Sequence, residues 1–123
     1  SISKRYGAGV IISENTMHKA SQLICRELDT IRVKGKEEPV IIYEPIELAG
    51  SEEELPVYIN DWKELLNLYK EQHWSLAKEQ LTRLEKEGEY IALINLYRKR
   101  IDHFQHIQAP GKNWDGVYNY TDK

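Results

Sequence analysis

The chain has 123 residues, of which 41% are hydrophobic and 30% charged, and its formal net charge is −3. This composition is typical of a globular protein and argues against a basic nucleic-acid-binding surface, and no apolar run approaches the roughly 18–20 residues of a membrane span. The single cysteine, Cys25, leaves no partner for an internal disulfide, as in proteins of a reducing compartment.

The first 26 residues predict a short strand followed by a helix. Gly7 and Gly9 flank an apolar run that we interpret as a strand over residues 9–12. Ser13 is a good helix N-cap, and a helix is predicted over residues 14–26. Its expected apolar face comprises Met17, Ala20, Leu23 and Ile24.

A β-hairpin is predicted next. Ile31 and Val33 alternate with polar residues, which indicates a strand over residues 28–33. Residues 34–38 form a polar turn around Gly35, and the return strand covers residues 40–43. The first half of the chain therefore predicts the order β-α-β-β.

The second half predicts helices. Residues 45–56 contain two prolines, a glycine and an acidic run, which is typical of a linker. Asp61 and Glu64 have the spacing of a capping box. Three apolar stripes follow, with a break at residues 87–89, a stop at Pro110-Gly111 and an aromatic tail that we expect to fold back on the helices. The stripes are Trp62, Leu65, Leu66 and Tyr69, then Trp74, Ala77, Leu81 and Leu84, then Tyr90, Leu93, Ile94, Tyr97, Ile101 and Phe104.

Few residues suggest chemistry when taken alone. Lys34 at the hairpin tip suits a phosphate contact, although a surface lysine is more often simply solvated. His103 and His106 share a helix face, but no set of cysteines or carboxylates in a matching arrangement stands out to complete a zinc site. His18 and His73 are expected on helix surfaces. Cys25 is expected near an apolar helix face as a small core residue.

The helical stripes permit two interpretations. Trp62, Leu65 and Tyr69 are similar to the first helix of a tetratricopeptide repeat, and Ala77 lies near the small residue of its second helix. Only one helical pair matches, whereas a stable array of repeats needs about three. Ordinary helix–helix packing is the simpler interpretation.

Two blocks of the first half resemble a known family. Residues 6–16, Tyr-Gly-Ala-Gly-Val-Ile-Ile-Ser-Glu-Asn-Thr, resemble the strand-to-helix segment of class III adenylate/guanylate cyclases. Residues 26–44, which contain Val-Lys-Gly-Lys-x-x-Pro-Val-x-x-Tyr-Glu, resemble the hairpin that closes that catalytic domain. The resemblance covers residues 1–48, roughly the last quarter of such a domain.

The second half resembles an extension found in some of these enzymes. Bacterial class III cyclases with a CHASE-type sensor end in a short helical extension that begins with Trp-x-x-x-Leu-x-x-Tyr and closes near Trp-Asp-Gly-Val. Trp62, Leu66 and Tyr69 match the first element, and residues 114–117 match the second. We therefore expect an α+β chain in three parts: residues 1–48 as the β-α-β-β end of a cyclase catalytic domain, 49–58 as a linker, and 59–123 as a helical, TPR-like or three-helix extension.

The resemblance implies a parent enzyme that converts ATP or GTP into a 3′,5′-cyclic nucleotide and pyrophosphate at a homodimer interface, with Mg²⁺ or Mn²⁺. The nucleotide phosphate-binding lysine falls on Lys34, with Lys36 as the second choice. The metal-binding aspartates, the base-selecting pair and the Asn-x-x-x-Arg helix are expected before Ser1. The segment itself is therefore expected to contain no catalytic residue and no metal site, and to be inactive alone.

The resemblance also implies a cytoplasmic location on a parent anchored in the inner membrane, with no nucleic-acid or membrane contact from this segment. The sequence does not separate ATP from GTP, because the base-reading residues lie elsewhere. It also leaves open the signal sensed and the role of the extension. An alternative function is a helical protein-interaction module with no enzymatic role.

Overall fold

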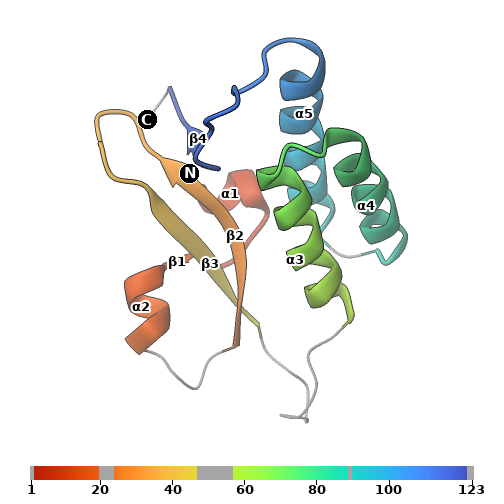
Figure 1. Cartoon of the computed structure of the whole chain (residues 1–123). Helices are drawn as coiled ribbons and strands as arrows, with labels where there is room; N and C mark the ends of the chain where they lie inside the picture. Colours follow the sequence, from red (N-terminus) through yellow and green to blue (C-terminus); the bar gives the residue numbers. More distant parts are fainter. Residues whose placement is uncertain (1, 20–23, 47–56, 89, 122–123) are drawn as a thin grey trace. The chain divides into compact units, whose positions relative to one another are not determined.

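A computed structural model gives the structure of residues 2–19, 24–46, 57–88 and 90–121 (Figure 1). These residues form an α+β protein with a four-stranded mixed sheet and five helices, three of them substantial. The helices are α1 (Ile2–Tyr6), α2 (Glu14–Lys19), α3 (Val57–Lys70), α4 (Trp74–Lys86) and α5 (Ile91–His106). The strands are β1 (Ile12–Ser13), β2 (Ile24–Arg32), β3 (Val40–Ile46) and β4 (Tyr118–Asn119).

The chain divides into two compact units, and each is built from two stretches of sequence. The helical unit comprises Ser1–Gly7 and Leu55–Gly116, and the sheet unit comprises Ala8–Glu54 and Val117–Lys123. The N-terminal helix α1 thus belongs with the helices, and the tail strand β4 belongs with the sheet. Most of the predicted linker, residues 49–56, lies outside the described residues, and residues 57–58 already belong to α3.

The sheet unit has the strand order β1-β3-β2-β4. The predicted hairpin is confirmed, because β2 and β3 are antiparallel and Ile31 pairs with Val40. Both strands are longer than predicted. Ile24 pairs with Ile46 at the far end, so Pro45, expected in the linker, is a strand residue. Strand β1 is antiparallel to β3, whereas β4 is parallel to β2.

A β-bulge at Leu28 changes which residues of β2 point toward its buried face. Glu27 pairs with Tyr43 and Asp29 with Ile42, so Leu28 is the extra residue. An inserted residue shifts the alternation of side chains by one. Even-numbered residues are accordingly buried before the bulge and odd-numbered residues after it: Arg26 and Leu28, then Asp29 and Ile31.

Two predictions for the first 26 residues are corrected. The predicted strand 9–12 is displaced toward β1, and Val10 is 59% exposed rather than buried. The predicted helix 14–26 begins correctly, since the Thr16 backbone N–H donates to Ser13 Oγ (3.3 Å), but α2 ends at Lys19. Residues 24–26 are strand because they pair with β3, and this long-range pairing overrides the helical spacing. Ala20 and Leu23 lie outside the described residues.

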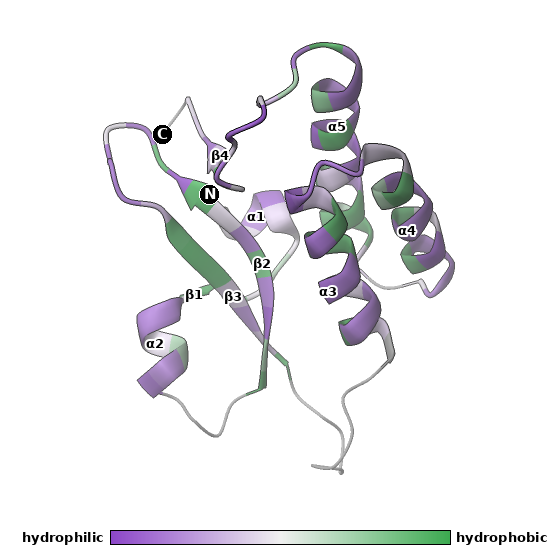
Figure 2. Ribbon diagram, in the orientation of Figure 1, coloured by the Kyte–Doolittle hydropathy of each residue, from purple (hydrophilic) through white to green (hydrophobic). Residues whose placement is uncertain are grey.

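The helical unit buries the three predicted apolar stripes. In α3 all four members of the first stripe are at most 4% exposed, and α4 and α5 each bury most of theirs. Figure 2 shows hydrophobic and hydrophilic residues on different sides of these helices. The predicted capping box is wrong, because α3 begins at Val57 and Asp61 lies inside it. None of the described helices combines the length and the apolarity that crossing a bilayer requires.

Candidate functional site

The tip of the β2–β3 hairpin is a tight turn that places Lys34 at its second position. The Lys36 backbone N–H donates to the Val33 carbonyl at 3.0 Å, which closes a four-residue turn. Gly35, at the third position, has φ +87°, whereas Lys34 has a negative φ. This combination is that of a type II turn, which requires positive φ only at its third residue. The turn therefore explains why glycine follows Lys34.

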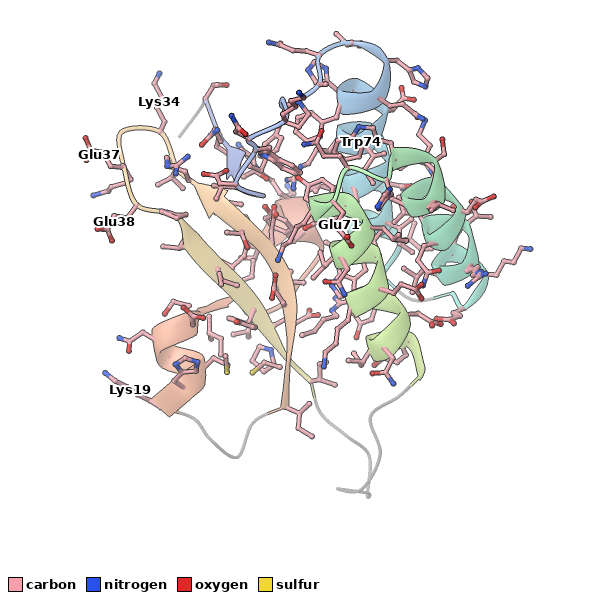
Figure 3. The ribbon with its side chains drawn as sticks, viewed as in Figure 1. Lys19, Lys34, Glu37, Glu38, Glu71 and Trp74 are labelled. Carbon is pink, nitrogen blue, oxygen red and sulfur yellow. The ribbon has the colours of Figure 1, made fainter. Side chains whose placement is uncertain are left out.

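The Lys34 side chain extends into solvent from this turn. Lys34 is exposed, and Figure 3 shows its ammonium group pointing away from the end of the hairpin. Lys36, Glu37 and Glu38 are also exposed, so the tip carries both charge signs. Such a tip is suited to one directed contact with an anion and not to a broad polyanion surface. Lys19 lies at the end of α2, well away from the tip in the same view.

Arg32 lies at the base of the turn and contacts both the opposite side of the turn and the C-terminal tail. Its Nε donates to the Glu37 carbonyl at 2.6 Å, and its NH1 donates to Asn119 Oδ1 at 2.5 Å. The Tyr120 backbone N–H donates to the Arg32 carbonyl at 2.9 Å. Sequence reasoning missed this arrangement. A two-residue strand has no periodicity, and its partner in β2 is far away in the chain.

A cross-strand ion pair stiffens the middle of the hairpin. Arg26 NH2 and Glu44 Oε1 are 2.6 Å apart, and the two residues are paired in the ladder. Their side chains are only 2% and 14% exposed. Ionised partners give short, strong hydrogen bonds, so this pair fixes the register of the strands that carry the turn.

Cys25 and the four histidines lie at separate positions of the described chain and are not gathered into a metal-binding or reactive cluster. Cys25 is half-buried in β2 rather than on a helix, and burial raises the pKa of its thiol. His103 and His106 are both exposed on α5, and His106 Nε2 lies 3.8 Å from Asp102 Oδ1. His18 and His73 are exposed as well. Within the described ranges no three His, Cys, Asp or Glu residues gather as metal ligands would.

The helical unit contains an aromatic cluster that the tail completes. Trp114 lies 5.1 Å from the Tyr69 ring and 5.5 Å from the Phe104 ring, and Trp74 lies 5.4 Å from Phe104. Figure 3 shows Trp74 at the start of α4, with Glu71 just before it on the α3–α4 turn. The pairs that Trp114 makes with Tyr69 and Phe104 are edge-to-face, an arrangement that stabilises packing beyond the area it buries. The prediction that the tail folds back on the helices is confirmed for Trp114 and is wrong for Tyr118, which pairs with β2 in the sheet unit.

Arg100 is a buried cation at the centre of the same unit. It is 7% exposed, its guanidinium carbon lies 4.9 Å from the Tyr97 ring centre, and its NH1 donates to the Tyr69 hydroxyl at 3.3 Å. A desolvated guanidinium over an aromatic face is stabilised by the ring quadrupole. This arrangement joins α3 to α5 and has the character of a core contact.

Comparison with protein-family models, with curated proteins and with solved structures found no match to this chain.

Proposed function

We propose that this segment is the C-terminal part of a class III nucleotidyl cyclase, which forms 3′,5′-cyclic AMP or cyclic GMP and pyrophosphate from ATP or GTP. The observation that carries the proposal is the exposed Lys34 at the second position of the turn that closes an antiparallel hairpin. The β1-α2-β2-β3 order also agrees with the β-α-β-β order that the resemblance implies. Residues 59–123 are then the C-terminal extension of such an enzyme, with α3, α4 and α5 as its helices and β4 as a strand added to the sheet unit.

In this proposal Lys34 makes one charge-assisted contact with the nucleotide phosphates. A lysine ammonium is a compact point charge, and the turn projects it beyond the sheet. Mg²⁺ or Mn²⁺ would neutralise the triphosphate and activate the 3′-hydroxyl in the complete enzyme. The resemblance assigns the ligands of this ion to residues before Ser1, and among the described residues no three His, Cys, Asp or Glu side chains gather as metal ligands would.

The proposal predicts that the 123-residue chain alone has no cyclase activity. A single charge-assisted contact contributes about 1.5–3 kcal/mol, whereas enzymes lower barriers by about 8–23 kcal/mol. Incubation of the purified chain with ATP or GTP and Mn²⁺, followed by mass spectrometry of the products, is expected to show no cyclic nucleotide. Turnover by the chain would contradict the assignment of the catalytic groups to residues outside it.

The parent of this segment is proposed to be a homodimer whose catalytic domain is cytoplasmic and whose anchor lies in the inner membrane. The test is to express the complete reading frame and assay it for both cyclic nucleotides. Formation of either product from its triphosphate supports the proposal. A complete reading frame that begins at or just before Ser1, or one that makes neither product with either metal, contradicts it.

A second candidate function is a helical protein-interaction module. It is favoured by apolar side chains that the helical unit leaves in solvent, since Leu76 is 51% exposed and Ile107 is 75% exposed. Scattered exposed apolar residues are common on soluble proteins, so the cyclase proposal is preferred. The same reading-frame experiment separates the two, because an interaction module requires no catalytic domain upstream.

A further inference from the structure

We propose that Arg32 is a positioning residue that uses the C-terminal tail strand to hold the Lys34 turn in place. This inference rests on the proposed function, since that function is the reason for holding Lys34 in one position. All the residues concerned belong to the sheet unit. No contact with nucleotide is assigned to Arg32 itself.

The tail lies beside the last residues of β2, just before the turn. Strand β4 is parallel to β2, with Tyr118 beside Ile31 and Asn119 beside Arg32. The Tyr120 N–H donates to the Arg32 carbonyl, which extends the pairing by one residue. This backbone pairing brings the Asn119 side chain within reach of the Arg32 guanidinium.

The guanidinium then connects the tail to the other side of the turn. Nε and NH1 of Arg32 donate in two directions, to the Glu37 carbonyl and to Asn119 Oδ1. Arginine can do this because its donors are held in a rigid planar fork, whereas a lysine has a single ammonium on a flexible stem. One side chain thereby fixes three segments: the end of β2, the return of the hairpin and the tail.

This connection matters because the turn extends beyond the paired strands. The last ladder pair is Ile31–Val40, so residues 33–39 extend past the sheet. The hydrogen bond from Arg32 Nε to the Glu37 carbonyl joins this segment to the end of β2. A loop that is ordered before binding loses less conformational entropy when it meets a ligand. Holding the base of the turn therefore favours the Lys34–phosphate contact.

The test compares variants of the 123-residue chain by two NMR measurements. Backbone ¹⁵N relaxation reports the order of the amides of residues 34–36. A titration with inorganic tripolyphosphate, followed through the chemical shifts of the same amides, reports the affinity of the turn for this ligand. The variants are Asn119→Ala, which removes one acceptor, Arg32→Lys, which keeps the charge and loses the fork, and Lys34→Ala. The matched control is Glu37→Ala, because the Glu37 contact uses the backbone carbonyl.

Asn119→Ala and Arg32→Lys are expected to lower the order of residues 34–36 and to weaken tripolyphosphate binding about threefold to tenfold, the loss expected of one hydrogen bond. Glu37→Ala is expected to keep the order of the wild-type turn. Melting temperatures within about 3 °C of wild type confirm that the variants are folded. Asn119→Asp keeps an acceptor at this position and is expected to restore the order.

The two proposals fail in different ways. Unchanged order in both Asn119→Ala and Arg32→Lys overturns the role of Arg32, whatever the phosphate titration shows. A wild-type turn whose amides do not respond to tripolyphosphate, or respond equally in Lys34→Ala, counts against the phosphate role of Lys34. In that case the relaxation data still decide whether Arg32 orders the turn.

Discussion

At the residue scale, the position of Lys34 depends on the backbone conformation of the next residue. Gly35 has φ +87°, a region that residues with a Cβ adopt only at a cost, and a Cβ built there meets nothing within 4 Å. The cost of a side chain at this position is therefore conformational and not steric. Gly9 provides a matched comparison, since its surroundings are equally open and its φ is not positive.

Gly35→Ala is expected to lower the free energy of unfolding by about 1–2 kcal/mol, because alanine is strained at positive φ. Gly9→Ala is expected to be neutral or to stabilise by up to about 1 kcal/mol, because alanine restricts the unfolded chain. Urea unfolding of both variants measures the difference. Equal stabilities for the two variants would show that the turn does not hold Gly35 at positive φ.

The turn and its glycine were the part of the candidate site most accessible from sequence. The Lys-Gly-Lys run between two apolar segments predicts a hairpin turn, and the structure places Lys34 and Gly35 in one. No sequence pattern singled out Arg32, because its partners are a backbone carbonyl and a residue of the C-terminal tail. Contacts of this kind depend on tertiary pairing, which local patterns do not encode.

At the scale of elements, the β2–β3 ladder is the framework of the sheet unit. Its length was underestimated because Ile24 and Cys25 fall at helical spacing with earlier apolar residues. Pairing with Ile46 and Pro45 decides their conformation instead. The helices α4 and α5 were easier to predict, since long amphipathic stripes have an unambiguous period.

Loss of the buried partner of Arg26 is expected to destabilise the hairpin. Glu44→Ala leaves the buried guanidinium without the carboxylate 2.6 Å away, which costs about 3 kcal/mol of unfolding free energy. Glu38→Ala, at an exposed position of the same hairpin, is expected to stay within about 0.5 kcal/mol of wild type. Chemical denaturation monitored by circular dichroism measures both. A Glu44→Ala variant as stable as Glu38→Ala would contradict this role for the pair.

In the helical unit, a surface ion pair joins α4 to α5. Lys78 Nζ lies 2.8 Å from Asp102 Oδ1, and this hydrogen bond, with the attraction of the Lys78 charge, lowers the pKa of Asp102. A lowered carboxyl pKa contributes stability above the unfolded pKa. That contribution is lost as the pH falls through the folded pKa, which lies below the usual value of about 3.9.

Lys78→Met is expected to raise the pKa of Asp102 toward its ordinary value. Titration of the Asp102 side-chain carboxyl by ¹³C NMR measures the shift. Lys99→Met, which removes a positive charge from α5, is the control and is expected to change this pKa much less. An unchanged Asp102 pKa in Lys78→Met would show that the pair does not form in solution.

At the scale of the whole molecule, the sequence pattern predicts only part of the division into two compact units. The change from strand to helix periodicity near residue 50 predicts a division there, but it gives no reason to place residues 1–7 with the helices or residues 117–123 with the sheet. Short segments such as α1 and β4 acquire their structure from the unit they join. Their assignment therefore required the tertiary structure.

The proposed function concerns the complete protein, because the proposal assigns one phosphate contact to Lys34 and assigns the metals and the recognition of the base to other residues of the parent. Lys34 and Lys36 provide an internal comparison within one turn. Both are exposed lysines, but Lys34 is the second residue of the turn and Lys36 the fourth. If the position in the turn decides which lysine contacts the phosphate, replacing Lys34 must lower activity more than replacing Lys36.

The most direct measurement is the rate of cyclic-nucleotide formation by the complete protein carrying Lys34→Ala or Lys36→Ala. The proposal predicts that Lys34→Ala lowers kcat/KM about 10- to 100-fold, the loss expected of one charge-assisted contact, and that Lys36→Ala stays within about twofold of wild type. A complete protein that makes no cyclic nucleotide, or one whose Lys34→Ala variant retains full activity, would contradict it.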